Sequence, residues 1–79
     1  MSDTTDRILE IISEVSGDED ISEDLDIDLF EEGLFDSLAA IEFLVQIEAE
    51  FGVSIAPTEI EREEMNTPRK IIERIEERM

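Results

Sequence analysis

The chain has 79 residues, about half the usual length of one domain, and we expect a single small domain over residues 1–79. Acidic residues outnumber basic residues 24 to 6, which gives a formal net charge of −18 at pH 7, but the hydrophobic fraction of 41% is that of a globular protein. The absence of cysteine and histidine excludes disulfides, zinc sites built on thiolate or imidazole, and catalysis by a histidine base.

Four segments are expected to be helical. The first is marked by apolar residues at helical spacing, and Gly17 supplies its stop; these residues are Ile8, Ile11, Ile12 and Val15. An acidic connection follows over residues 18–36, and its apolar anchors are Leu25, Ile27, Leu29 and Phe30. A connection of this length is uncommon unless it packs down or has a function.

Aspartates at alternate positions in this connection, Asp24, Asp26 and Asp28, begin like a calcium-binding loop. The sixth position is Leu29 and the twelfth is Phe35, where such a loop needs glycine and glutamate. We therefore expect no specific metal site.

The second helix is expected over residues 37–51, with Gly52 as its C-terminal cap. At about 100° per residue, its core stripe comprises Ala40, Phe43, Leu44, Ile47 and Phe51. The opposite side comprises Leu38, Glu42, Val45 and Ala49. Leu38 and Val45 are therefore either isolated exposed apolar residues or the anchors of a docking face.

A short third helix is expected around residues 58–63, after Pro57. The last helix is expected to begin at Thr67 as N-cap, with Pro68 at the first helical position. Its buried side comprises Ile71, Ile72, Ile75 and Met79. No segment alternates like a strand, so the expected fold class is all-α: a small four-helix bundle of three main helices and a short third helix.

The charge pattern limits the partners. A large negative charge repels the phosphates of nucleic acids and anionic lipid surfaces, and no apolar run approaches the roughly 18 residues of a membrane span. We expect a cytoplasmic monomer that neither binds nucleic acid nor inserts into a membrane. Residues 8–61 contain no basic side chain, which indicates either a solvated surface or one that steers basic partners.

Ser37 stands at the start of the second helix, directly after Asp36. Taken alone, a serine there is most often an N-cap. It is not a catalytic nucleophile, because the chain has no histidine and no lysine lies near it in sequence. It can instead accept a group from another enzyme, because a helix N-terminus favours an attached phosphate. Asp36 would then help to hold the hydroxyl, or a metal ion carried by the modifying enzyme's substrate.

Residues 29–38, which contain the motif Asp-Ser-Leu at 36–38, resemble the carrier protein family, as does the amphipathic helix that follows. The resemblance covers nearly the whole chain and implies a fold like that of acyl carrier proteins. It implies that Ser37 receives 4′-phosphopantetheine, whose thiol replaces a cysteine, and that the protein is not itself an enzyme. The residues that it implies face partner enzymes are Leu38, Glu42 and Val45.

Residues 25–37 and 59–71 are similar to the D-alanyl carriers within this family. The matching residues in the second stretch are Arg62, Thr67, Pro68, Lys70 and Ile71, and Met65 stands where tryptophan is usual. This similarity implies that a phosphopantetheinyl transferase modifies Ser37 from coenzyme A. A ligase then adenylates D-alanine with ATP, and the prosthetic thiol captures it as a thioester. A membrane-bound O-acyltransferase delivers it to lipoteichoic acid in cell wall biogenesis.

Other functions remain open. An acyl carrier for fatty acid or polyketide synthesis, or another free-standing aminoacyl carrier, would use the same Ser37 and would differ in the group found on the thiol. A non-carrier acidic helical protein, which binds a basic partner or mimics DNA, would use Ser37 only as a cap. Its mass would not change on incubation with coenzyme A and a transferase.

Overall fold

The computed structural model of the protein describes residues 3–56 and 58–79. Its elements, in chain order, are α1 (Asp3–Ser16), the 3-10 turn η1 (Ile21–Glu23), α2 (Ser37–Phe51), the 3-10 turn η2 (Arg62–Glu64) and α3 (Pro68–Glu76). The described residues contain no strand. The prediction of an all-α fold is therefore confirmed.

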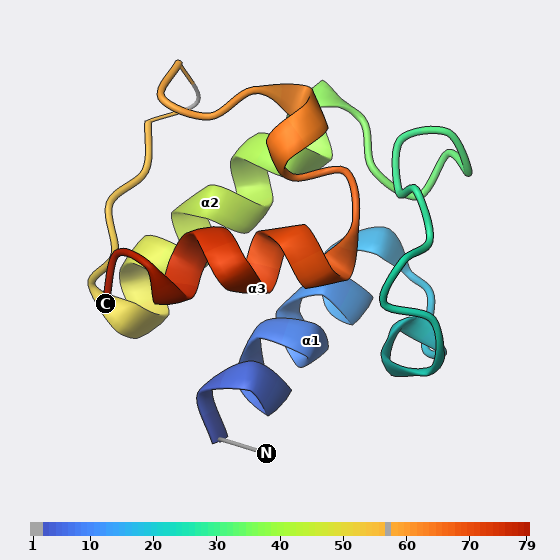
Figure 1. Ribbon diagram of the computed structural model, residues 1–79, viewed down its shortest axis with the longest axis horizontal. Coiled ribbons are helices and arrows are strands. Elements are labelled where there is room, and N and C mark those ends of the chain that lie inside the picture. Colours follow the sequence, from blue (N-terminus) through green and yellow to red (C-terminus); the bar gives the residue numbers. More distant parts are fainter. Residues whose placement is uncertain (1–2, 57) are drawn as a thin grey trace.

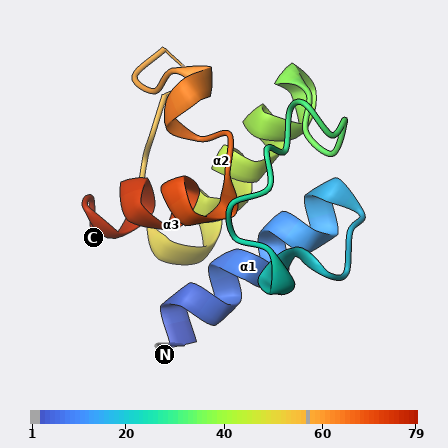
Figure 2. The same ribbon diagram turned by 45° about the vertical axis from the view of Figure 1, so that its right-hand side comes forward.

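The three α-helices enclose one apolar core. α1 packs against both α2 and α3, and α3 crosses in front of α2 in Figure 1. The segment between α1 and α2 runs along one side of the helices and returns the chain to the start of α2, as the turned view in Figure 2 also shows. The most deeply buried side chains are Ile8, Ile11, Ile12, Ile21, Leu29, Phe43, Ile47, Pro68, Ile71 and Ile75.

The apolar faces expected for the first and last helices, α1 and α3, are confirmed for most of their residues. α1 also buries Leu9, whereas Val15 is only partly buried. At the start of α3, the Thr67 side chain accepts a hydrogen bond from the Lys70 backbone N–H, and Pro68 is the first helical residue. The local signals of capping and periodicity thus place the main helices correctly.

The prediction of a short third helix over residues 58–63 is wrong in its position and extent. Residues 58 and 59 form a turn and residue 60 a bend, and the single 3-10 turn η2 lies between them and α3. Glu61 caps η2, and the Glu64 side chain accepts a hydrogen bond from the Glu61 N–H at 3.0 Å in a reciprocal capping box. This capping box makes Arg62 the first residue of η2. Because η2 is a single 3-10 turn, the expected count of four helices is not confirmed. Pro57, expected before that helix, lies outside the described residues.

Met79 was expected on the buried side of the last helix, and this prediction is wrong. Its side chain is 60% exposed. α3 ends at Glu76, with Glu77 as its C-cap, so the helical stripe stops before it reaches Met79.

The long segment before α2 is held by hydrogen bonds that the Asp28 carboxylate accepts. One Asp28 carboxylate oxygen accepts from the backbone N–H groups of Phe30, at 3.1 Å, and Glu31, at 3.0 Å. The other accepts from the Asn66 side-chain amide at 3.1 Å, and the Leu29 N–H donates to the Asn66 carbonyl at 2.7 Å. Asp28 therefore ties this segment to the residues that precede α3.

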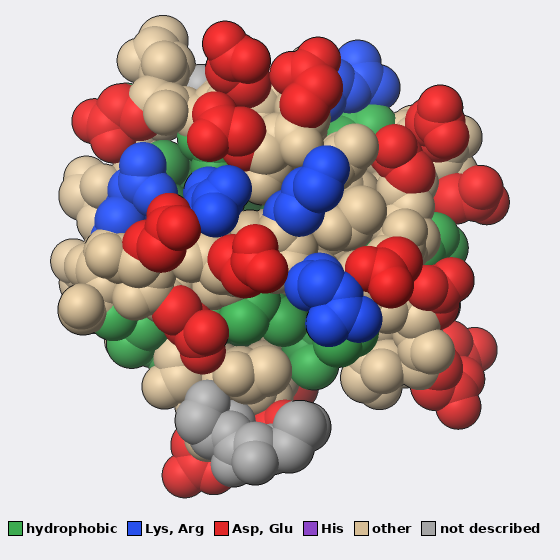
Figure 3. Space-filling model, viewed as in Figure 1, with side chains coloured by type: hydrophobic (Ala, Val, Ile, Leu, Met, Phe, Trp, Pro, Cys, Tyr) green, Lys and Arg blue, Asp and Glu red, His purple; other side chains and the backbone are tan. Residues whose placement is uncertain are grey.

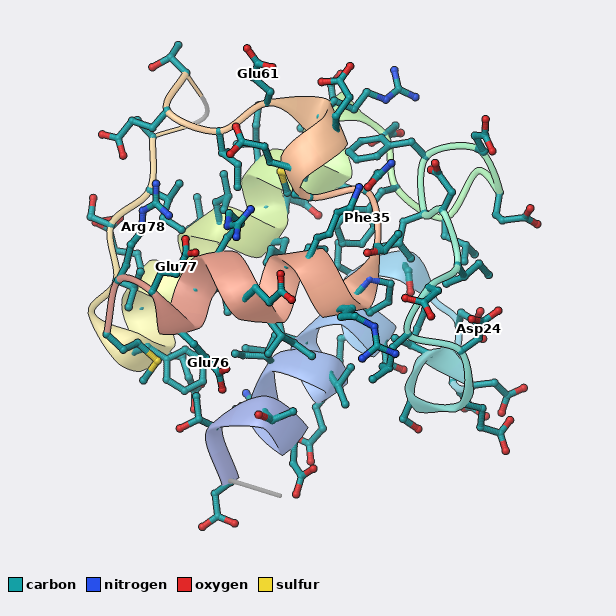
Figure 4. The ribbon with its side chains drawn as sticks, in the orientation of Figure 1. Asp24, Phe35, Glu61, Glu76, Glu77 and Arg78 are labelled. Atoms are coloured by element: carbon teal, nitrogen blue, oxygen red, sulfur yellow. The ribbon has the colours of Figure 1, made fainter. Side chains whose placement is uncertain are left out.

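Aromatic packing fixes the end of the same segment. Phe35 is buried, and its ring centroid lies 5.9 Å from that of Phe43 in α2 and 6.1 Å from that of Phe30. Figure 4 shows Phe35 pointing inward, whereas Asp24 lies on the outer side of the segment. The residues just before Ser37 are therefore anchored in the core.

Replacing Asp28 with alanine is expected to destabilise the fold by about 2 kcal/mol, because it removes three hydrogen bonds that close the segment. Asp24→Ala is the matched control, because Asp24 is exposed and, among the described residues, its carboxylate accepts only from the Asp26 N–H. Urea unfolding of both variants measures the difference. Equal unfolding midpoints would contradict the role given to Asp28.

Ion pairs offset only part of the acidic charge. Arg7 of α1 pairs with Glu10 at 2.8 Å and with Glu50 of α2 at 3.1 Å, and Arg69 pairs with Asp26 at 2.9 Å. The hydrogen bond and charge of Arg69 lower the pKa of Asp26 below its usual value. Figure 3 shows the basic side chains gathered over the face that carries α3, with acidic side chains around them.

The melting temperature is expected to rise as salt increases from about 0.01 to 0.15 M, because screening weakens repulsion among exposed charges. Salt also weakens the ion pairs, but 24 acidic residues face only 6 basic ones, so repulsion is the larger effect. Melting followed by circular dichroism in NaCl and in KCl tests this. A melting temperature that falls over this range in both salts would contradict it.

Candidate functional site

Ser37 is the first residue of α2, and Asp36 is its N-cap. The Asp36 carboxylate accepts a hydrogen bond from the Ala39 N–H at 2.8 Å, and the Asp36 carbonyl accepts from the Ala40 N–H at 2.9 Å. The reading of Ser37 as the N-cap is therefore wrong, because the carboxylate one residue earlier takes that role. Ser37 is left exposed, with no hydrogen bond from its hydroxyl to any described residue.

The first turn of α2 also keeps free donors. Within the described part of the chain, the backbone N–H groups of Ser37 and Leu38 have no hydrogen-bond acceptor. Such groups, together with the helix dipole, favour a negative charge at this end of the helix. The local geometry therefore suits a phosphate on the Ser37 hydroxyl.

An open cavity of about 200 Å³ lies beside Ser37. It is lined mostly by apolar side chains, and the full set is Phe30, Ser37, Ala40, Ile41, Leu44, Ile60, Arg62 and Met65. The cavity joins the start of α2 to η2 and to the loop before α2, segments that Figure 1 shows close together. The sequence alone gave no sign of it, because its walls come from three separate parts of the chain.

The second helix has the two faces expected from its sequence. Phe43, Leu44 and Ile47 are buried, whereas Leu38 is 67% exposed and Val45 is 61% exposed. Glu42 is exposed on the same outer face, and Gly52 adopts the left-handed conformation, with φ of 72°, that caps the helix.

The exposed face contains one residue that the sequence did not indicate. Ile41 is 43% exposed and lies one helical turn from both Leu38 and Val45. These three residues form an apolar stripe that starts next to Ser37, and we call it the outer stripe of α2.

Comparison with known proteins decides the family. A family model described as "Phosphopantetheine attachment site" matches residues 6–75. The D-alanyl carrier protein of Lactococcus lactis subsp. lactis is 47% identical, over 91% of this chain and 91% of that protein. The chain belongs to the D-alanyl carrier protein family. Two further relatives are also D-alanyl carrier proteins. The protein of Abiotrophia defectiva is 44% identical over 92% of each chain, and that of Enterococcus faecalis is 39% identical over 87% of this chain and 88% of that protein.

Membership in the D-alanyl carrier protein family establishes the cofactor and the general role. The chain is a carrier protein, and its cofactor is phosphopantetheine attached covalently to a serine. The resemblance inferred from the Asp-Ser-Leu motif is thereby confirmed. The match covers most of the chain, including all of α2 and most of α1 and α3.

Five serines lie in the described part of the chain, and they differ in their surroundings. Ser13 donates to the Asp18 carbonyl at 2.8 Å, and Ser16 is part-buried at the end of α1. Ser22 lies in the three-residue turn η1, and Ser54 follows α2. Ser37 is the one among them at the N-terminus of an α-helix.

The aspartates that were tested as a calcium loop have other partners. Asp24 accepts from a backbone N–H, and Asp26 pairs with Arg69, while Asp28 closes the segment before α2. Within residues 3–56 and 58–79, no group of three or more acidic side chains is arranged to hold a metal ion. None of the described helices has the length and apolar character that crossing a membrane requires.

Proposed function

We propose that Ser37 is the attachment serine, and that the chain carries D-alanine as a thioester on the attached arm for the D-alanylation of lipoteichoic acid. The observation that carries the proposal is the exposed, unbonded Ser37 hydroxyl at the first position of a 15-residue helix that Asp36 caps. The cargo is proposed from the family, because relatives that are 47% and 44% identical to this chain are D-alanyl carrier proteins.

The residues around Ser37 have distinct roles in this proposal. When a transferase acts, the Ser37 oxygen bonds to the pantetheine phosphorus of coenzyme A, the pyrophosphate bond breaks to release adenosine 3′,5′-bisphosphate, and the hydroxyl proton is lost. The N–H groups of Ser37 and Leu38 face the resulting phosphodiester charge, while Asp36 fixes the start of the helix. The bound cofactor supplies a thiol that holds the aminoacyl group as a thioester.

The chain supplies docking and a mobile attachment point, and its partners supply catalysis. We propose three partners: a phosphopantetheinyl transferase, a D-alanine-activating ligase and a membrane-bound O-acyltransferase. The residues that contact them are Leu38, Glu42 and Val45, and the outer stripe adds Ile41. We also propose that the carrier is a cytoplasmic monomer and that residues 1–79 form a single domain. In this domain, η2 lies where a fourth helix was expected.

A loading assay tests the cargo. The chain is first modified with coenzyme A and a transferase, and it is then offered D-alanine, L-alanine or an acyl donor with the corresponding activating enzyme. Intact mass is expected to show a D-alanyl adduct that hydroxylamine removes, and much slower loading with L-alanine. Equal or preferred loading with a long acyl chain would overturn the D-alanine assignment without changing the attachment site.

The cavity beside Ser37 favours a second candidate, an acyl carrier for fatty acid or polyketide synthesis. Its apolar lining includes Ile41, Leu44 and Met65, which would accommodate a short acyl chain. The acyl-donor arm of the loading assay distinguishes this candidate from a D-alanyl carrier.

A further inference from the structure

Arg62 has a position that the carrier function has not yet explained. It is the first residue of η2 and lines the same cavity as Ser37, although the two residues are far apart in the sequence. Its guanidinium lies over the Phe30 ring, 4.5 Å from the ring centroid. Phe30 also lines this cavity, so the stacking holds the cation at the cavity wall.

The other basic side chains of the described region have polar partners. Arg7, Arg69 and Arg74 form ion pairs with carboxylates, and Lys70 and Arg78 donate to backbone carbonyls. Arg62 has no ion pair or side-chain hydrogen bond with any described residue. Among the described residues, Arg62 is therefore the one basic side chain with neither a carboxylate nor a carbonyl partner, and it lines the cavity that contains Ser37.

We infer that Arg62 binds the phosphate of the group attached at Ser37 and acts as a positioning residue for that group. This inference rests on the proposal that Ser37 is the attachment serine. An arginine suits this role because its planar guanidinium donates several hydrogen bonds in the geometry of phosphate oxygens. Stacking on Phe30 limits the motion of the guanidinium before the phosphate arrives, so less conformational entropy is lost on contact.

The contact predicts that attachment links η2 to α2. Ser37 belongs to α2, Arg62 belongs to η2, and Phe30 belongs to the segment between α1 and α2. A phosphate shared by Ser37 and Arg62 therefore joins three segments that line one cavity. Without Arg62, the start of α2 still favours a phosphate, but the added charge then lies beside the Asp36 carboxylate of an acidic protein with no cation to offset it, so attachment is expected to stabilise the fold less.

A thermodynamic cycle tests this contact. The melting temperatures of the apo and phosphopantetheine-modified forms are compared for the parent chain, for Arg62→Gln and for Arg78→Gln. Arg78→Gln is the matched control, because it removes the same charge from a residue just beyond the C-terminal end of α3, away from the cavity (Figure 4). Comparing apo with modified protein within each variant cancels the effect of the substitution on the apo fold.

Attachment is expected to raise the melting temperature of the parent chain and of Arg78→Gln by on the order of 3 °C. The rise is expected to be clearly smaller in Arg62→Gln, which keeps only the stabilisation by the helix N-terminus. In the parent chain, the Arg62 Nε–H resonance is expected to shift on attachment, while that of Arg78 stays in place. An equal melting shift in all three chains, or an unmoved Arg62 resonance, would overturn the contact. If mass spectrometry finds no group on Ser37 of the parent chain, the attachment site fails and the contact fails with it.

Discussion

Ser37→Ala is expected to gain no mass when it is incubated with coenzyme A and a phosphopantetheinyl transferase, because the acceptor oxygen is gone. The fold is expected to survive, with a melting temperature within about 2 °C of the parent. The reason is structural: Asp36, not Ser37, accepts the hydrogen bond from the Ala39 N–H that caps α2. Loss of modification therefore comes without loss of structure.

Two further variants make this result specific. Ser54→Ala removes another exposed serine of the described region and is expected to be modified like the parent. Asp36→Ala removes the cap and is expected to destabilise the fold by about 1 kcal/mol, although its serine remains. A mass gain in Ser37→Ala that depends on the transferase would show that another residue is the acceptor.

The second large effect is expected from a pair of neighbouring residues on α2. Val45 is 61% exposed and Leu44 is 7% exposed, so the same substitution has opposite consequences at the two positions. Leu44→Asp places a charge in the core and is expected to unfold the chain. Val45→Asp is expected to change stability by no more than about 0.5 kcal/mol.

Val45→Asp is nonetheless expected to slow loading by the ligase, or transfer by the acyltransferase, by about tenfold or more, because a charge then faces an apolar pocket of the partner. Leu38→Asp, at the other end of the outer stripe, is expected to behave in the same way. Circular dichroism melting and a loading time course for each variant separate folding from docking. If Val45→Asp and Leu38→Asp are both loaded and both transfer their cargo at the rates of the parent chain, the outer stripe does not contact these partners.

The features that the sequence predicted correctly are those set by local signals. Thr67 followed by Pro68 marks the start of α3, and Gly52 marks the end of α2, because each acts on the turn next to it. The exposure of Leu38 and Val45 follows from helical spacing once the helix is placed. These predictions need no knowledge of distant contacts.

The features that were not predicted from the sequence depend on competing N-cap residues or on contacts between distant parts of the chain. Asp36 and Ser37 are both good N-caps, and only the extended backbone of Asp36, with ψ of −175°, decides between them. The stacking of Arg62 on Phe30 joins residues on two separate segments. Phe35 is buried without periodic apolar neighbours, because the segment around it is irregular.

The most direct test of the central claim is to locate the phosphopantetheine on the chain. The parent protein is modified with coenzyme A and a transferase, digested, and sequenced by tandem mass spectrometry, and the modified residue is read from the fragment masses. The account predicts the group on Ser37 and on none of the other five serines. A peptide in which Ser37 is unmodified while another residue carries the group would contradict it.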